Sequence, residues 1–319
     1  MKPAAIMLAI WALLLPGAAA AQTYPVKTVR MVVGFPPGGP TDMLARIVAQ
    51  KLGESWGQQV IVDNRAGASG MIGAELVARA APEGYTLLMV PVTFAVTPSL
   101  FSKMNYDSER DFAAVAQVAA APFILVVHPT LPVKSVKELV ALARARPGQL
   151  NYASASTGGM PHLAGELFNL MAGVKMVHVP YKGAAPATTD LLAGQVQLMF
   201  NNMLSAMPQV KAGRLRALAV TSTRRSNALP ELPAIAETLP GYEASGWYGL
   251  LAPAATPREA VARINSETSR IMKLPEVAQR LAGDGVEAVG TTPGQFAAYL
   301  RAEIEKWGRI VKTAGIKAD

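Results

Sequence analysis

Residues 34–42 form the stretch best suited to bind a ligand, and they read Gly-Phe-Pro-Pro-Gly-Gly-Pro-Thr-Asp. An apolar, β-branched run at 29–33 precedes them and an amphipathic helical pattern follows, so they join a strand to a helix. Gly38 and Gly39 carry no side chains, and the unpaired N–H groups at a helix start attract an anion such as a carboxylate. Asp42 falls in the first helical turn, where it faces the positive end of the helix dipole. An ordinary tight turn is the alternative.

Three further turns share this layout of small residues between an extended run and a helix. They cover 64–70 (Asn-Arg-Ala-Gly-Ala-Ser-Gly), 152–162 (Tyr-Ala-Ser-Ala-Ser-Thr-Gly-Gly-Met-Pro-His) and 180–186 (Pro-Tyr-Lys-Gly-Ala-Ala-Pro). Each helix N-terminus carries about half a positive charge. With two such turns in each half of the chain, the pattern predicts a cleft in which backbone amides from both sides hold a small anion.

Side chains in and beside these turns complete the predicted site. Phe94 follows the third strand, where its ring would either stack on a flat ligand or pack in the core. Asn202 would either bond a polar ligand or serve turn chemistry, and Asp42 would orient its loop rather than touch an anion. The candidate ligand-binding residues are Phe35, Pro37, Gly38, Gly39, Thr41, Asp42, Ala68, Ser69, Thr93, Phe94, Ser154, Ser156, Thr157, Gly158, Gly159, His162, Tyr181, Lys182 and Asn202.

The sequence contains no recognisable catalytic or cofactor motif. Residues 67–70 lack the second glycine of a nucleophile elbow, and neither a phosphate-binding loop nor a dinucleotide-binding fingerprint follows the first strand. His162 and Glu166 lie four residues apart, but a metal site needs a third ligand. With no cysteine in the chain, disulfides and a lipid-anchored cysteine are excluded. We therefore predict no catalytic residue, no metal and no cofactor.

Length and charge set the broad class. A chain of 319 residues, half of them hydrophobic, is large enough for two lobes. The net charge of +8 is spread along many predicted helices, and residues 224–225 are the only adjacent basic pair, which argues against nucleic-acid binding. The positive charge favours attraction of anionic ligands or a membrane surface, or simply a solvated basic surface.

The N-terminus resembles a secretory signal peptide. Lys2 precedes an apolar run at 6–15 that is too short to span a bilayer, and four alanines at 18–21 offer a cleavage site before Gln22. We therefore expect residues 1–21 to be removed and the mature protein to be periplasmic.

Strand and helix patterns alternate along the mature chain, which is typical of βαβ units. The expected strands cover 29–35, 60–62, 86–90, 113–118, 123–128, 151–154, 176–180, 196–200, 216–221 and 243–252. The expected helices cover 42–56, 70–80, 136–146, 161–171, 186–193, 203–212, 257–272, 276–283 and 293–314.

Two consecutive extended runs, 113–118 and 123–128, interrupt the alternation and indicate a crossing into a second lobe. The prediction is an α/β fold of two lobes, each a mostly parallel sheet flanked by helices, joined by a two-strand hinge near 119–125 and 244–251. Lobe 1 would comprise 22–120 and 250–319, and lobe 2 would comprise 121–249.

Four motifs in order carry a family resemblance: Phe-Pro-Pro-Gly-Gly-Pro-Thr-Asp at 35–42, Asn-Arg-Ala-Gly-Ala-Ser-Gly at 64–70, Pro-Tyr-Lys-Gly at 180–183 and Gly-Trp-Tyr-Gly at 246–249. Together they resemble the Bug-type (TctC-like) periplasmic receptors of tripartite tricarboxylate transporters. The resemblance implies a two-lobed binding protein of the type II kind that closes around a di- or tricarboxylate, an acidic amino acid or an aromatic carboxylate. It also implies a large and a small membrane subunit as partners, and receptors of this class are commonly monomeric.

One position departs from the family pattern. The family often has Thr-His-Ala-x-Asn after the third strand, whereas residues 93–97 read Thr-Phe-Ala-Val-Thr. We therefore expect a ligand less polar than citrate, such as an aromatic or longer aliphatic carboxylate. A receptor for a signalling kinase and, less well supported, an exported esterase are the alternative functions.

Overall fold

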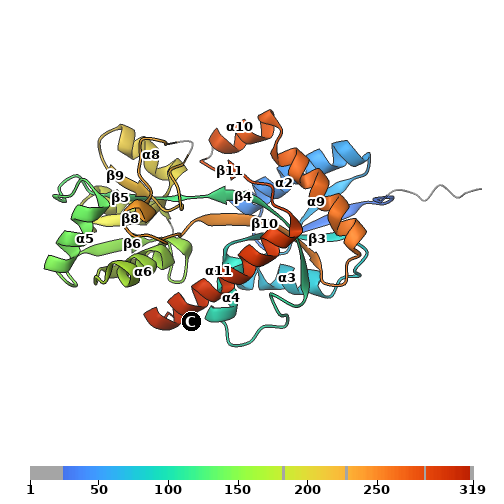
Figure 1. The fold of residues 1–319 in the computed structure, drawn as a ribbon, viewed down its shortest axis with the longest axis horizontal. Coiled ribbons are helices and arrows are strands. Elements are labelled where there is room, and N and C mark those ends of the chain that lie inside the picture. Colours follow the sequence, from blue (N-terminus) through green and yellow to red (C-terminus); the bar gives the residue numbers. More distant parts are fainter. Residues whose placement is uncertain (1–23, 182–183, 227–228, 284, 317–319) are drawn as a thin grey trace, which may run out of the picture.

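The computed structural model describes residues 24–181, 184–226, 229–283 and 285–316. Two β-sheets, each flanked by helices, lie side by side along the long axis of the molecule (Figure 1). The expected signal peptide lies outside the described residues. Within the described ranges, no helix combines the length and the apolar character that a membrane span requires.

The first sheet, with its helices, forms lobe 1. Its strand order is β11-β4-β10-β3-β1-β2. The strands are β1 (Val29–Val33), β2 (Val60–Asn64), β3 (Thr86–Pro91), β4 (Phe112–Ala121), β10 (Gly246–Pro253) and β11 (Glu287–Ala288). The helices are α2 (Pro40–Trp56), the 3₁₀ turn η2 (Ala68–Gly70), α3 (Met71–Ala78), α4 (Thr93–Leu100), α9 (Arg258–Met272), α10 (Pro275–Gly283) and α11 (Pro293–Ala314).

The second sheet, with its helices, forms lobe 2. Its strand order is β7-β6-β8-β5-β9. The strands are β5 (Phe123–Val127), β6 (Asn151–Ser154), β7 (Val177–Pro180), β8 (Leu198–Asn202) and β9 (Arg216–Val220). The helices are α5 (Val136–Ala145), α6 (Met160–Ala172), α7 (Ala184–Leu192), α8 (Met203–Lys211) and the 3₁₀ turn η3 (Ile235–Glu237).

Both sheets are mixed, which corrects the expectation of mostly parallel sheets. Strands β2-β1-β3 and β7-β6-β8 pair in parallel, whereas β10 and β5 pair antiparallel with both of their neighbours. Parallel neighbours need a helical crossover, and β4 passes to β5 through one residue, Pro122, so these strands belong to different sheets.

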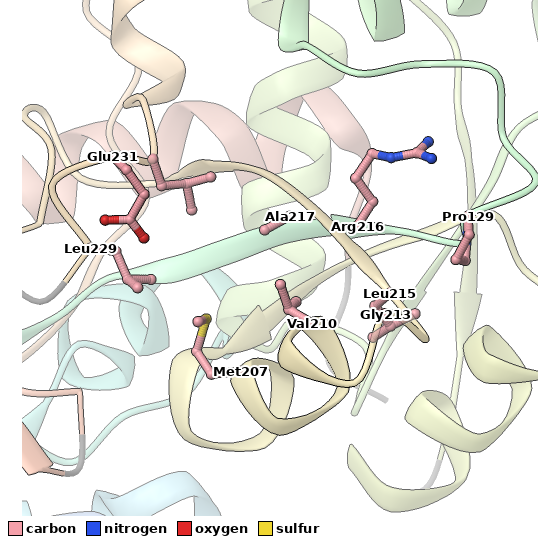
Figure 2. Close-up of a pocket in the computed structure, with 10 residues that line it drawn as sticks. Pro129, Met207, Val210, Gly213, Leu215, Arg216, Ala217, Leu229 and Glu231 are labelled. Carbon is pink, nitrogen blue, oxygen red and sulfur yellow. The ribbon is translucent and has the colours of Figure 1, made fainter.

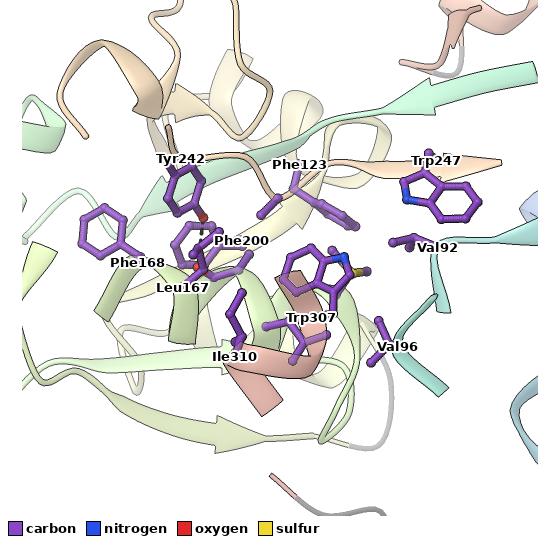
Figure 3. Packing of buried hydrophobic residues seen from close by; sticks show 14 of the residues in the cluster. Val92, Val96, Phe123, Leu167, Phe168, Phe200, Tyr242, Trp247, Trp307 and Ile310 are labelled. Atoms are coloured by element: carbon purple, nitrogen blue, oxygen red, sulfur yellow. Dashed lines mark hydrogen bonds between the residues drawn. The ribbon is translucent and has the colours of Figure 1, made fainter. Parts of the chain in front are cut away.

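Strand β10 lies in the first sheet from its first residue. Gly246 pairs with Ala121 at the end of β4, and the pairing continues to Pro253. We expected the chain to leave lobe 1 after residue 120, and this boundary falls just before the last residue of β4. We expected it to return after residue 249, and this boundary falls within β10. One continuous hydrophobic core runs under both sheets, with Trp247 and Trp307 between them (Figure 3).

Helix α4 is the element that the sequence pattern missed. Its residues include three β-branched side chains and an internal Pro98, all of which disfavour a helix. Tertiary packing overrides these preferences, because Phe94, Ala95 and Val96 are all buried. Strand β11, only two residues long, was also not expected.

Candidate functional site

The turn between β1 and α2 presents backbone groups at the carboxyl end of the sheet. Gly38 adopts a left-handed φ of +83°, and Gly39 is the N-cap residue of α2, with φ −79° and ψ 168°. No side chain caps α2. The N–H of Gly38 donates to Asp42 Oδ2 at 2.9 Å, so this amide is already used within the turn. Amides further along the helix start remain for a ligand.

Asp42 holds this turn in shape. It is buried, and its Oδ2 also accepts from Arg46 Nε at 2.9 Å, while Oδ1 accepts from Asn64 Nδ2 at 2.9 Å. The Arg46 hydrogen bond, with those from Gly38 and Asn64, lowers the pKa of Asp42 to about 2. Both carboxylate oxygens are occupied, which fits the expectation that Asp42 orients the loop.

The turn between β2 and α3 has an unusual backbone. Ala68 and Ser69 have φ of +47° and +56°, and the flanking Gly67 and Gly70 also have positive φ. Residues with a Cβ rarely adopt this region, and such strain concentrates at functional sites. A Cβ on Gly34 would lie 2.8 Å from Gly70, so the first and second turns pack backbone against backbone.

A small pocket in lobe 1 gathers four predicted residues, Phe35, Ser69, Thr93 and Phe94. The Oγ1 of Thr93 is buried, and within the described part of the chain it has no hydrogen-bond partner. A buried hydroxyl without a partner is costly, so it favours a ligand or a water here. Thr97 closes the same pocket and donates to the Thr93 carbonyl at 2.7 Å.

Phe94 lies in the core, which is one of the two alternatives that the sequence left open. It is 5% exposed, stacks on Tyr106 with centroids 6.1 Å apart and meets Phe112 edge-on. Its ring forms one wall of the pocket rather than a platform for a flat ligand.

The turn between β6 and α6 repeats the geometry of the first turn. Gly158 has φ +73°, and Gly159 is the N-cap residue of α6, with φ −73° and ψ 160°. The N–H of Gly158 donates to His162 Nδ1 at 3.0 Å, four residues ahead, as Gly38 does to Asp42. The side chain of Leu100, at the end of α4 in lobe 1, lies 3.2 Å from the Cβ position of Gly158.

A buried pair of histidines supports the lobe 2 turn. The rings of His162 and His178 stack with centroids 3.7 Å apart and planes within 9°. Ser154 donates its hydroxyl proton to the Ser156 carbonyl, so it accepts from His178 Nε2 at 2.6 Å. His162 Nδ1 is an acceptor, so the His162 ring is neutral.

Burial lowers the pKa of both histidines. The pKa of His162 falls to about 3, mainly by desolvation and then by the neighbouring His178, and that of His178 falls to about 4 by desolvation. Tyr152 contacts this cluster and donates to Glu166. Glu166 Oε1 lies 3.9 Å from His162 Nε2, and across the described ranges no cluster of three or more potential ligands for a metal ion occurs.

Other predicted residues of lobe 2 lie at the ends of β7 and β8. The Tyr181 hydroxyl donates to Asp190 at 2.7 Å. Burial and the Asp190 carboxylate raise the pKa of Tyr181 to about 12. Asn202 is exposed and is the N-cap residue of α8, and the buried Asn201 accepts from its N–H at 2.8 Å. Lys182 lies outside the described residues.

Sequence reasoning gave no supporting role to Asn64 and His178, and for Asn201, as for Asn202, it left ligand binding and turn chemistry open. Asn64, His178 and Asn201 each position a turn rather than presenting an atom to the ligand, and each makes its contact across more than the local sequence. Their position in the sequence could have identified them, because each lies in or at the end of a strand that leads to a predicted turn.

A larger pocket lies elsewhere on lobe 2. Figure 2 shows this cavity of about 480 Å³ beside α8 and β9, with Met207, Val210, Leu215 and Leu229 in its wall. No predicted ligand-binding residue is among those that line it, so size alone does not mark the candidate site.

Comparisons with known proteins agree with the sequence resemblance. The family model described as Tripartite tricarboxylate transporter family receptor (TctC) matches residues 44–316. Protein BugT of Bordetella pertussis is 38% identical over 300 residues, which cover 93% of this chain and 92% of BugT.

Two solved structures are similar over nearly the whole chain. R. palustris Rpa4515 with adipate is 40% identical, with a TM-score of 0.75, and the match covers 92% of this chain and 100% of that chain. MatC (Rpa3494) from Rhodopseudomonas palustris with bound malate is 32% identical, with a TM-score of 0.70, and the match covers 90% and 100%. These matches confirm the two-lobed fold, and because the family consists of receptors they also confirm that the chain is not an enzyme.

Proposed function

Because this chain belongs to the tripartite tricarboxylate transporter receptor family, we propose that it captures a small aliphatic dicarboxylate between its two lobes. The observation that carries the proposal is the matched pair of Gly-Gly turns at the starts of α2 and α6. Each turn uses one amide internally and leaves the helix N-terminus open to an anion. Two such ends suit a ligand with a carboxylate at each end.

The ligand class follows from similar proteins and from the pocket. The similar structures hold adipate and malate, both aliphatic dicarboxylates. The lobe 1 pocket is mostly apolar, with the unpartnered Thr93 hydroxyl inside it. The pocket has only about 10 Å³ of free volume and cannot enclose the chain of the ligand, but as an apolar wall of the cleft it favours an acid that is less hydrated than citrate. The contact of Leu100 with the lobe 2 turn supports a shared cleft, since the other end of α4 carries Thr93.

The remaining elements of the proposal concern the cellular setting. The protein is exported to the periplasm by a signal peptide at residues 1–21, acts as a monomer and delivers its ligand to the large and small membrane subunits of the transporter. The family description supports this partnership. The hinge comprises Pro122, between β4 and β5, and the segment that leads into β10 at Gly246.

Isothermal titration of residues 22–319 against adipate, malate and citrate tests the proposal. We expect tight binding of adipate or malate and much weaker binding of citrate. The sharpest variant is Gly39→Val, since a Cβ there meets only the Pro36 carbonyl at 3.7 Å and the backbone is extended. The fold should be kept while the branched side chain blocks the helix start, so the affinity should fall about tenfold or more.

The matched control is Gly294→Val at the start of α11, where a Cβ meets nothing within 4 Å. We expect this variant to bind like the unmodified protein. Equal affinities for Gly39→Val and Gly294→Val would refute the role of the first turn, and an absence of binding by every dicarboxylate would refute the ligand class.

A further inference from the structure

Helix α11 spans the two lobes without belonging to the predicted ligand site. In Figure 1 it runs from β10 in lobe 1 toward α6 in lobe 2. Its contacts with α4 and β4 of lobe 1 are far more extensive than those with α6. A closing motion about the two connecting segments must therefore move α11 with one lobe and past the other.

Three close approaches bind α11 to lobe 1. Any side chain on Gly249 of β10 would overlap the ring of Phe296. Farther along α11, a Cβ on Gly308 would lie 3.2 Å from Ser99 Oγ on α4. Gly249 and Gly308 thus let α11 lie directly on β10 and α4. Gly246 is a packing position of another kind, because a Cβ there would lie 3.2 Å from a carbonyl of β4. Both glycines of the Gly-Trp-Tyr-Gly motif at 246–249 are therefore explained by packing.

Glu303 is the third and most specific of these contacts. Its side chain is 3% exposed, and its Oε2 accepts from the indole Nε1 of both Trp247 and Trp307 at 2.8 Å. Lys306 pairs with its other oxygen and also donates to the Glu243 carbonyl at 3.3 Å. Trp307 and Lys306 belong to α11 itself and hold the carboxylate in place, and the charge-assisted bond from Trp247 ties α11 to the hinge end of β10.

The contact between α11 and lobe 2 is looser. Ile310 of α11 is buried in the shared core, but beyond it a surface groove of about 160 Å³ lies between Thr313 and Ala314 of α11 and the facing residues of α6. Leu170 of α6, which lines this groove, is 52% exposed. Because α6 packs against α11 over a smaller area than α4 and β4 do and leaves this groove beside it, the α6–α11 interface is the one that can shift with less loss of packing.

We propose that Glu303 fixes α11 to lobe 1 and that α6 slides along α11 when the lobes close. The proposal rests on ligand-driven closure, which is part of the proposed function. Glu303 is thus a positioning residue for ligand capture, because it determines which interface yields during the motion.

Crosslinking tests this directly, since the chain has no cysteine of its own. Ser99→Cys with Gly308→Cys joins α4 to α11 through a disulfide, since a Cβ at position 308 would lie 3.2 Å from Ser99 Oγ, and Leu170→Cys with Thr313→Cys joins α6 to α11 through a short bismaleimide. Adipate affinity is measured by titration and closure by small-angle X-ray scattering. The α4–α11 crosslink should leave affinity within about twofold and keep compaction, whereas the α6–α11 crosslink should weaken binding about tenfold or more and abolish compaction.

Two outcomes overturn the proposal: loss of compaction in the α4–α11 crosslinked protein, or full compaction in the α6–α11 crosslinked protein. Each double variant before crosslinking serves as its own control. If those controls bind neither adipate nor malate, the proposed function fails. The sliding is then tested without ligand, because only the α6–α11 crosslink should narrow the range of particle sizes in scattering.

Variants of Glu303 add a spectroscopic test. The indole N–H groups of Trp247 and Trp307 should exchange slowly with solvent, with and without adipate. Glu303→Ala should remove that protection and weaken adipate binding about threefold or more, and Glu303→Gln, which keeps an acceptor oxygen, should restore part of both. Unchanged affinity in Glu303→Ala would contradict the positioning role.

Discussion

The two Gly-Gly turns have nearly the same backbone, but one is supported by a charged side chain and the other by a neutral one. Gly38 and Gly158 have φ of +83° and +73°, and in each turn the glycine N–H donates to the side chain four residues ahead. In lobe 1 the acceptor is the carboxylate of Asp42, and in lobe 2 it is the neutral ring of His162.

The supports differ accordingly. Asp42 is held by Arg46, which is half exposed, and by Asn64 from the next strand. His162 is held by stacking on His178 inside lobe 2. The comparison teaches that the turn needs an acceptor at this position but not a charge, so the chemistry of the support can differ while the backbone presented to a ligand stays the same.

The largest effect should come from His162→Ala. The ring is 6% exposed, so its loss opens a cavity against His178 and leaves the buried Gly158 N–H without an acceptor. We expect a loss of about 3 kcal/mol in the free energy of unfolding. Asp42→Ala should lose about 2 kcal/mol, because water reaches the exposed partners Gly38 and Arg46. Urea denaturation of both variants measures the difference, and a larger loss for Asp42→Ala would reverse the comparison.

The pH dependence should separate the two turns next. The pKa of His162 is about 3 in the folded protein, well below the ordinary 6.5, so between these values the unfolded chain binds more protons. Stability is therefore complete above about pH 6.5 and falls with acidification, by about 2 kcal/mol for His162 alone between pH 7 and pH 5. The Asp42 contribution is present above about pH 4 and is lost only toward its pKa of about 2.

Urea denaturation at pH 7 and pH 5 measures this dependence. His162→Asn should reduce it, since an amide oxygen replaces Nδ1 as acceptor and does not titrate, while His178, with a pKa of about 4, still contributes. His128→Asn, in the same lobe but outside the stacked pair, is the matched control. The same pH slope in His162→Asn and in the unmodified protein would contradict the assignment.

Much of the fold was predictable because it follows local pattern. Alternating apolar runs and glycine or proline punctuation placed nearly every strand and helix within a few residues. Helix α4 was not predictable, since its β-branched residues and Pro98 disfavour a helix that only burial of Phe94 and its neighbours stabilises.

Of the candidate site, the position of the turns was predictable from the sequence. Glycine pairs before a helix identify where backbone amides are open, so Gly39 and Gly159 could be found from the sequence. The sequence could not show that the backbone N–H groups of Gly38 and Gly158 donate to Asp42 and His162 and are therefore not available to a ligand. Nor could it show the stack of His162 on His178, because that contact joins α6 to a strand sixteen residues away.

Conservative exchanges should have smaller effects than truncations. Asp42→Asn and His162→Asn both keep an oxygen that can accept from the turning glycine. We expect each to lose about 1 kcal/mol or less relative to the unmodified protein at pH 7. Thermal denaturation with and without adipate measures this. If Asp42→Asn lost as much free energy of unfolding as Asp42→Ala, the lobe 1 turn would need the negative charge itself and not only an acceptor.

The smallest effect should come from Arg46→Ala. Its guanidinium donates to Asp42 Oδ2 but is largely open to solvent, and exposed ion pairs contribute little. Gly38 and Asn64 still donate to Asp42 without it, so the turn should keep its shape and adipate its affinity. What should change is the pKa of Asp42, which should rise toward its ordinary value because the Arg46 hydrogen bond is the main cause of its depression. Carboxyl NMR titration of Asp42 measures this shift, and an unchanged pKa together with lost ligand binding would mean that Arg46 contacts the ligand instead of the loop.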